Sequence, residues 1–234
     1  MMHLSRSVTA PTRFYSLGGE VIKSVTEAQY LGVTLSNCYG TRTSQWKSHI
    51  VDTAAKTNRR LGYLRRKLKG CPYRLRELAY TTLVRSTLEY CGSVWDTTVQ
   101  CESETVEMVQ HRAARWARGA HGIVSITELL KQLKWQTLAD RREVSRLNLF
   151  YKILNNDIDI PPECVDIRLQ EGRVTRKQQK QHNLTLKRIR GKDQFSPLWK
   201  GTIARTIPVW NSLPKDTAEV GSFIAFKSRL SPAP

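Results

Sequence analysis

The chain has 234 residues, 40% of them hydrophobic, which is enough to bury the core of one large domain or two small ones. Lys and Arg number 38 against 20 Asp and Glu, a formal net charge of +18 at pH 7. Such an excess indicates an anionic partner, with nucleic acid ahead of an anionic membrane surface. No stretch approaches the roughly 18 apolar residues that span a bilayer, and the N-terminus lacks the apolar segment of a signal peptide. We therefore expect an intracellular protein, nuclear or cytoplasmic, that is not secreted, has no transmembrane segment and does not bind membranes.

The cysteines are odd in number, widely spaced and never arranged as CxxC. This pattern indicates reduced thiols and favours neither a disulfide framework nor a zinc site. The five are Cys38, Cys71, Cys91, Cys101 and Cys164.

Residues 13–35 contain the only β-structure that the sequence predicts. The runs RFYSL and EVIKSV flank Gly18 and Gly19, which adopt positive φ at low cost, so this stretch is expected to form a β-hairpin. Residues 29–35 (QYLGVTL) are expected to form one further extended segment.

Residues 46–69 are predicted to form a helix with two different sides. Apolar or small side chains recur at steps of three and four residues, which gives the helix a packing face. Seven of the fourteen residues from Lys56 to Lys69 are basic and none is acidic. A solvated helix face and a surface for an anionic partner both fit this pattern, although like charges four residues apart repel each other. The packing stripe consists of Trp46, Ile50, Thr53 or Ala54, Thr57, Leu61, Leu64 and Leu68; the opposite side carries Lys56, Arg59, Arg60, Arg66 and Lys67; and Arg65 and Lys69 flank the stripe.

Further helices follow. Residues 73–95 have a wide apolar band, typical of a helix that packs on more than one side, and Gly92 is a candidate for its end. Residues 103–118 begin with acids and end with bases, which suits the helix dipole, and Gly119 is placed to end that helix. Helices are also expected from a capping box at residues 125–128 to residue 133, at 137–155 and at 222–230.

A basic, polar stretch separates the last helices. Between Gly172 and Lys192 the sequence has eight Lys or Arg and no acid, which is typical of a disordered linker and also of a nucleic-acid-binding or nuclear-import tract. The candidate binding residues there are Arg176, Lys177, Lys187, Arg188 and Arg190.

The fold class expected from these elements is mainly α, with a short N-terminal β-hairpin before a helical bundle and a helical C-terminal extension. The expected divisions are a hairpin segment at 1–37, a three-helix region at 41–118, a helical extension at 119–165, a basic linker at 166–194 and a C-terminal helical segment at 195–234.

The sequence offers little for catalysis. Two-metal phosphoryl transfer needs at least two carboxylates held together, and the nearest approach is Asp157 and Asp159, which we interpret as turn acids. The five histidines show no ligand spacing, and no phosphate-binding loop or nucleophile motif is present. We therefore expect no catalytic residue, metal site or cofactor in this chain.

A family resemblance extends these interpretations. The segments YLGVTL, KTNRRLGYLRRKLKGCP, LAYTTLVRSTLEYCGSVWD, VEMVQHRAARWARG, LKWQTLADRREVSRLNLFYKILNN and RTIPVWNSLP stand in that order. Together they resemble the C-terminal part of the reverse transcriptase (RNA-directed DNA polymerase) of non-LTR retrotransposons of the jockey-like kind, transposable elements. The similarity covers about residues 13–230.

The resemblance implies roles for two segments. Tyr30, Leu31 and Gly32 match the primer-grip motif, which positions the end of the growing strand. Residues 46–69 match a thumb helix, whose basic side would face the backbone of an RNA/DNA template–primer duplex or another polyanion. The region after Trp95 resembles the family's C-terminal extension.

The resemblance also implies what this chain lacks. The family's catalytic Asp residues, and the Mg²⁺ that they bind, would lie before Met1, so we expect a truncated copy that is not an enzyme on its own. A fingers–palm portion acting in trans would be needed for polymerisation. The alternative is a structural or protein-interaction remnant with no retained nucleic-acid role.

Overall fold

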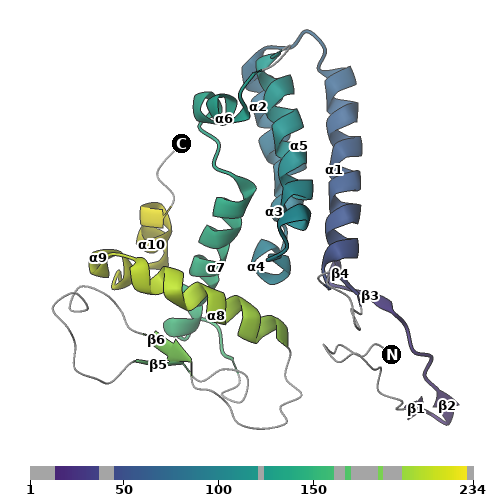
Figure 1. The fold of residues 1–234 in the computed structure, drawn as a ribbon, viewed down its shortest axis with the longest axis vertical. Helices are drawn as coiled ribbons and strands as arrows, with labels where there is room; N and C mark the ends of the chain where they lie inside the picture. The colour runs from purple at the N-terminus through teal and green to yellow at the C-terminus, as the bar shows by residue number, and fades with distance from the viewer. Residues whose placement is uncertain are drawn as a thin grey trace. The chain divides into compact units, whose positions relative to one another are not determined.

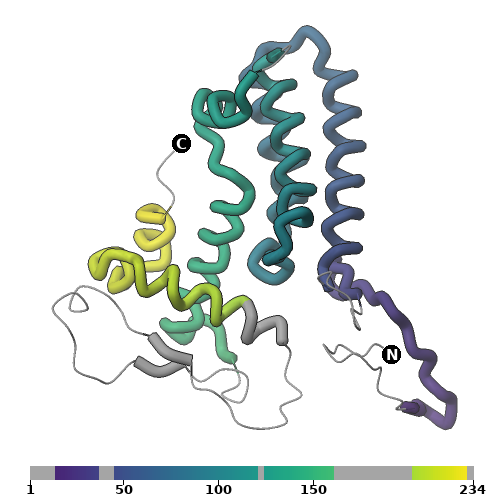
Figure 2. Tube along the Cα trace, viewed as in Figure 1, coloured from purple at the N-terminus to yellow at the C-terminus, as the bar shows by residue number. Residues whose placement is uncertain are grey.

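A computed structural model describes residues 14–36, 45–120, 124–160, 167–169, 184–186 and 197–230 (Figures 1 and 2). The fold is mainly helical and begins with short antiparallel β-structure, as predicted. The chain forms two compact units, Met1–Cys91 with Thr97–Ala139, and Gly92–Asp96 with Asp140–Pro234.

Two hairpins open the first unit. Strands β1 (Ser16–Leu17) and β2 (Glu20–Val21) pair around Gly18 and Gly19, which confirms the predicted hairpin. Strands β3 (Glu27–Tyr30) and β4 (Val33–Ser36) form a second antiparallel pair. The expectation of one extended segment at 29–35 is therefore wrong, because a two-residue turn divides it.

The turn between β3 and β4 has an uncommon backbone. Leu31 and Gly32 have φ values of 47° and 79°. Positive φ at both central residues is what a two-residue hairpin needs to match the twist of its strands. Glycine adopts it readily, whereas leucine does so at a cost.

Three helical segments, which run parallel or antiparallel to one another, form the bundle of the first unit. They stand side by side in Figure 1. They are α1 (Lys47–Lys67), α2 (Tyr73–Tyr80), which continues through the π-helix η1 (Thr81–Arg85) into α3 (Ser86–Glu89), and α5 (Gln100–Arg118). The predicted packing stripe of α1 is buried except for the half-buried Leu68. The buried residues of the bundle include Ile50, Leu61, Tyr80, Val84, Leu88, Val106, Val109 and Ala113.

The helix predicted at 73–95 ends earlier than expected. Its regular part stops at Glu89, and Cys91 adopts a φ of 52°. Gly92 does not end this helix but begins the short α4 (Gly92–Trp95), which belongs to the second unit.

Helix α6 (Ile126–Leu133) follows α5 in the first unit. Gly119 ends α5 with a φ of 62°, as predicted. Ser125 is the N-cap of α6 but makes no side-chain capping hydrogen bond, so the predicted capping box is not formed. Apolar contact holds α6 instead: Leu129, Leu130 and Leu133 cluster with Ala114 and Ala117 of α5.

The second unit packs helices around aromatic residues. It contains most of α7 (Leu138–Leu154), together with α8 (Pro197–Ser212), α9 (Lys215–Ala218) and α10 (Phe223–Leu230). The rings of Tyr151 and Phe226 stack with their centroids 4.3 Å apart. Phe150 meets Trp210 edge to face at 5.3 Å. The predicted helices at 137–155 and 222–230 are confirmed within a residue or two.

The segment expected to be a linker contains a further strand pair. Strands β5 (Ile167–Leu169) and β6 (Leu184–Leu186) are antiparallel. The expectation that β-structure is confined to residues 13–35 is therefore wrong. The other residues of 166–194 lie outside the described part of the chain.

Candidate nucleic-acid interface

The exposed side of α1 is strongly basic. Its predicted contact residues Lys56, Arg59, Arg65, Arg66 and Lys67 are all exposed, as is Lys69 just beyond the helix. Asp52 is the one acid in α1. None of these six basic groups forms an ion pair with any residue that the structure describes. We call these six residues the α1 basic surface.

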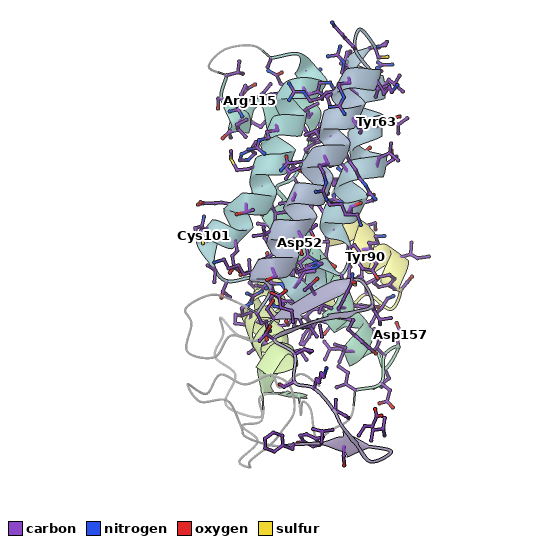
Figure 3. All side chains as sticks on the ribbon, turned by 90° about the vertical axis from the view of Figure 1, so that its right-hand side faces the viewer. Asp52, Tyr63, Tyr90, Cys101, Arg115 and Asp157 are labelled. Carbon is purple, nitrogen blue, oxygen red and sulfur yellow. The ribbon has the colours of Figure 1, made fainter. Side chains whose placement is uncertain are left out.

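An aromatic side chain lies within this surface. Tyr63 is 54% exposed, and the Lys67 ammonium lies 5.9 Å from the centroid of its ring. In Figure 3 Tyr63 projects outward from α1, on the same helix as Asp52. Sequence reasoning missed Tyr63, although its spacing of four residues from both Arg59 and Lys67 places it among them. An exposed ring among cations suits stacking on a nucleic-acid base.

Arg60 behaves differently from its basic neighbours. Its Nη1 donates to the Thr87 hydroxyl oxygen at 2.5 Å and lies 3.4 Å from the Leu83 carbonyl oxygen. Arg60 therefore connects α1 to η1 and α3. The structure does not place it with the α1 basic surface, where the sequence pattern had grouped it.

Helix α5 adds positive charge beside α1. Arg112 donates from Nη1 to Oδ1 of Asn58 at 3.0 Å, and Arg115 one turn further along is exposed (Figure 3). Burial lowers the pKa of the neighbouring His111, and the positive charge of Arg115 lowers it further. Arg118, in contrast, donates to the Gln132 carbonyl oxygen at 2.7 Å. Of the basic residues late in α5, Arg112 and Arg115 thus extend the basic side of the bundle.

The YLG turn is held by two contacts. The Tyr90 hydroxyl donates to the Leu31 carbonyl oxygen at 3.0 Å. The Thr34 amide donates to Nδ1 of His49 at 3.3 Å, which ties β4 to the first turns of α1. Burial lowers the pKa of His49, and the nearby Asp52 partly opposes that shift. Burial therefore favours the neutral ring, which an accepting Nδ1 requires.

The turn itself remains accessible. Tyr30 and Leu31 are 69% and 73% exposed. A Cβ on Gly32 would lie 3.4 Å from Cε1 of Tyr90, so the ring packs against the bare side of this glycine. The three predicted primer-grip-like residues therefore form one exposed hairpin tip, which Tyr90 holds through its hydrogen bond to Leu31 and its contact with Gly32.

The remaining sequence predictions concern the basic segment, the cysteines, metal ligands and membrane-spanning helices. Arg176, Lys177, Lys187, Arg188 and Arg190 lie outside the described residues. Cys71, Cys91 and Cys101 are not disulfide-bonded, and the other two cysteines are not described. Among described residues, no three His, Cys, Asp or Glu are grouped so that they could hold a metal ion. No described helix combines the length and apolar character needed to cross a bilayer.

The comparisons with known proteins add no relative: no protein-family model, curated protein or solved structure matches this chain.

Proposed function

We propose that this chain binds the backbone of an RNA/DNA template–primer duplex, without sequence selectivity, through the α1 basic surface, and that it has no catalytic activity of its own. The observation that carries the proposal is the set of six exposed Lys and Arg side chains without acidic partners in the described structure. A buried apolar stripe fixes the opposite side of the same helix. The helix is therefore held by its bundle while its charge faces outward.

The charge pattern suits phosphate rather than a base edge. Lys and Arg that contact phosphates position a protein on a duplex but read no sequence. The basic residues recur along about three turns of α1, from Lys56 to Lys67, and Lys69 follows just beyond the helix. A row of charges along one helix can follow successive phosphates of a strand, so the surface favours an extended polyanion over a small anion.

The hairpin tip supports the same function. Tyr30 and Leu31 present exposed side chains on a turn whose backbone is fixed by Tyr90 and His49. A leucine held at positive φ is costly, and such strain is often kept at binding sites. We assign this tip a contact with the primer end of the duplex.

The salt dependence of binding tests the proposal. Fluorescence anisotropy with a labelled RNA–DNA hybrid should show log K falling linearly with log salt, with a slope of roughly −3.5 to −4.5 if about five phosphates are contacted. Duplexes of unrelated sequence should bind equally well. A slope near zero would overturn the proposal.

A protein-interaction role is the second candidate, and one observation favours it. Leu75, Leu78 and Leu83 on α2 and η1 are each more than 40% exposed, and clustered exposed apolar residues often mark protein contacts. Heparin should compete with nucleic acid for the α1 basic surface but should leave a protein partner on α2 bound. If the partner is a fingers–palm portion acting in trans, mixing the two parts with Mg²⁺ should restore primer extension.

A further inference from the structure

A single acid in the second unit is surrounded by three arginines. Oδ1 of Asp96 accepts from Nε of Arg142 at 3.0 Å. Oδ2 contacts Nη1 of Arg146 at 3.0 Å and Nη2 of Arg205 at 2.5 Å. Asp96 directly follows α4, Arg142 and Arg146 lie on α7, and Arg205 lies on α8. We call these four residues the Asp96 cluster.

Among the residues that the structure describes, the Asp96 cluster holds more positive than negative groups. Its three guanidinium groups meet one carboxylate, and Glu143, which lies 3.5 Å from Arg146, is 48% exposed and hence well solvated. The side chains of Arg142 and Arg146 are only 3% and 9% exposed. Burying a charge that is not fully paired is unfavourable, so a further anion beside these arginines would stabilise the cluster.

Buried donors of the Asp96 cluster lack acceptors among the described residues. Nε of Arg146 and Nε of Arg205 are buried and have no hydrogen-bond partner in the described structure. Burial lowers the pKa of Arg146; Asp96 and Glu143 oppose this shift, while the positive charges of Arg205 and Arg142 add to it. The site therefore offers both unused donors and uncompensated charge.

Arg142 is also held in place before any anion binds. The Arg142 guanidinium lies over the Trp95 ring, 5.4 Å from its centroid. A Cβ on Gly92 would lie 3.3 Å from Cγ of Arg142, so this glycine leaves the room that the arginine stem fills. Donors fixed in advance lose little entropy on binding. Arg205, 29% exposed, gives the cluster an opening to solvent.

We propose that the Asp96 cluster is an anion site that binds one phosphate-type oxyanion through Arg146 and Arg205, with Asp96 orienting both guanidinium groups. Planar guanidinium donors match the oxygen geometry of phosphate. The oxyanion is either free phosphate or a phosphate of nucleic acid. The site lies outside α1 and does not depend on the function proposed for the α1 basic surface.

The test measures the melting temperature of the full chain while potassium phosphate replaces potassium chloride at constant ionic strength. Phosphate also stabilises proteins in general, so the variants decide the result. We expect a saturable rise in melting temperature for the wild type and for Lys227→Gln, an exposed charge in α10 of the same unit. Arg205→Gln should retain only the general, non-saturating rise.

Asp96→Asn separates an anion site from a purely structural ion cluster. Removing the carboxylate that Arg146 and Arg205 share takes away a negative charge beside both of them, so this variant should melt lower in chloride and recover more strongly in phosphate than the wild type does. Equal phosphate responses in the wild type and Asp96→Asn would overturn the proposal.

Calorimetric titration of the wild type with phosphate keeps the test independent of variant folding. Absence of saturable heat would also overturn the proposal. If a short oligonucleotide displaces the bound phosphate, the source is nucleic acid; if it does not, the source is the free anion. The double variant Arg59→Gln/Arg66→Gln should keep the phosphate response, so a failure of the α1 proposal would be recognised separately.

Discussion

The Tyr90 hydroxyl donates to the Leu31 carbonyl oxygen at 3.0 Å, and this bond joins residues that are 59 positions apart. The same ring packs against Gly32, where a Cβ would lie 3.4 Å away. One tyrosine at the end of α3 therefore fixes the tip of the β3–β4 hairpin. The YLG turn and the LEY segment, which are far apart in the sequence, therefore form one local structure.

Gly32→Ala should destabilise this hairpin tip. Gly32 has a φ of 79°, which costs an L-residue about 1–2 kcal/mol, and the new methyl group would press on the Tyr90 ring. We expect urea unfolding to show a loss of that size. Gly221→Ala is the control, because Gly221 has no heavy atom near its Cβ position and no positive φ; an equal loss in both variants would contradict the explanation.

Much of the fold follows from sequence patterns because local rules determine it. The packing stripe of α1, the glycine that ends α5 and the turn at Gly18 and Gly19 all rest on spacing or on backbone freedom. The break at Cys91 was missed because a non-glycine residue adopts positive φ there. The glycine at the neighbouring position 92 is explained by its close contact with Arg142, fifty residues away. Patterns over a few neighbouring residues cannot predict such a contact.

The candidate site was predictable to the same extent. Helical periodicity separates the basic and apolar sides of α1. Of the seven basic residues from Lys56 to Lys69, five lie in the helix with exposed side chains that form no ion pair with a described residue. The hydrogen bonds of Arg60 could not be predicted because its partners, Thr87 and the Leu83 carbonyl, belong to other segments. The contribution of Arg112 likewise depends on the packing of α5 beside Asn58.

The double variant Arg59→Gln/Arg66→Gln should weaken duplex binding and flatten its salt dependence. Each lost phosphate contact removes about 0.7–0.9 from the slope of log K against log salt, so the slope should fall by about 1.4–1.8. The matched control Lys131→Gln/Lys227→Gln removes two exposed charges outside the α1 basic surface. An equal change in the control would show that net charge alone governs binding.

Arg60→Gln should lower the stability of the fold and leave duplex binding unchanged, the opposite of the result expected for the double variant. It removes hydrogen bonds between α1 and the segment formed by η1 and α3, so the free energy of unfolding should fall by about 0.5–1.5 kcal/mol. The salt slope of duplex binding should stay within error of the wild type. A slope reduced as far as that of a single Arg59→Gln variant would place Arg60 on the binding surface instead.

Acid should loosen the β3–β4 hairpin through His49. Burial lowers the pKa of His49 in the folded state, so its neutral form is favoured by folding. Its contribution is therefore complete above the unfolded pKa of about 6.5 and is lost as the pH falls through the folded value. The melting temperature should drop between pH 7.5 and 5 by less in His49→Gln than in the wild type. His111, whose pKa is also lowered, should account for part of the drop that remains.

Tyr63→Ala should distinguish stacking from charge on the α1 basic surface. The exposed Tyr63 ring contributes no charge, so its loss should leave the salt slope unchanged while weakening binding to a duplex with a single-stranded end. Stacking on one base is worth about 1–3 kcal/mol, so the dissociation constant should rise about five- to 150-fold. Tyr63→Phe keeps the ring and should bind like the wild type. If Tyr63→Ala and Tyr63→Phe bind the overhanging duplex with equal affinity, and the blunt duplex likewise, Tyr63 contacts no base. The α1 basic surface would then act through its charges alone.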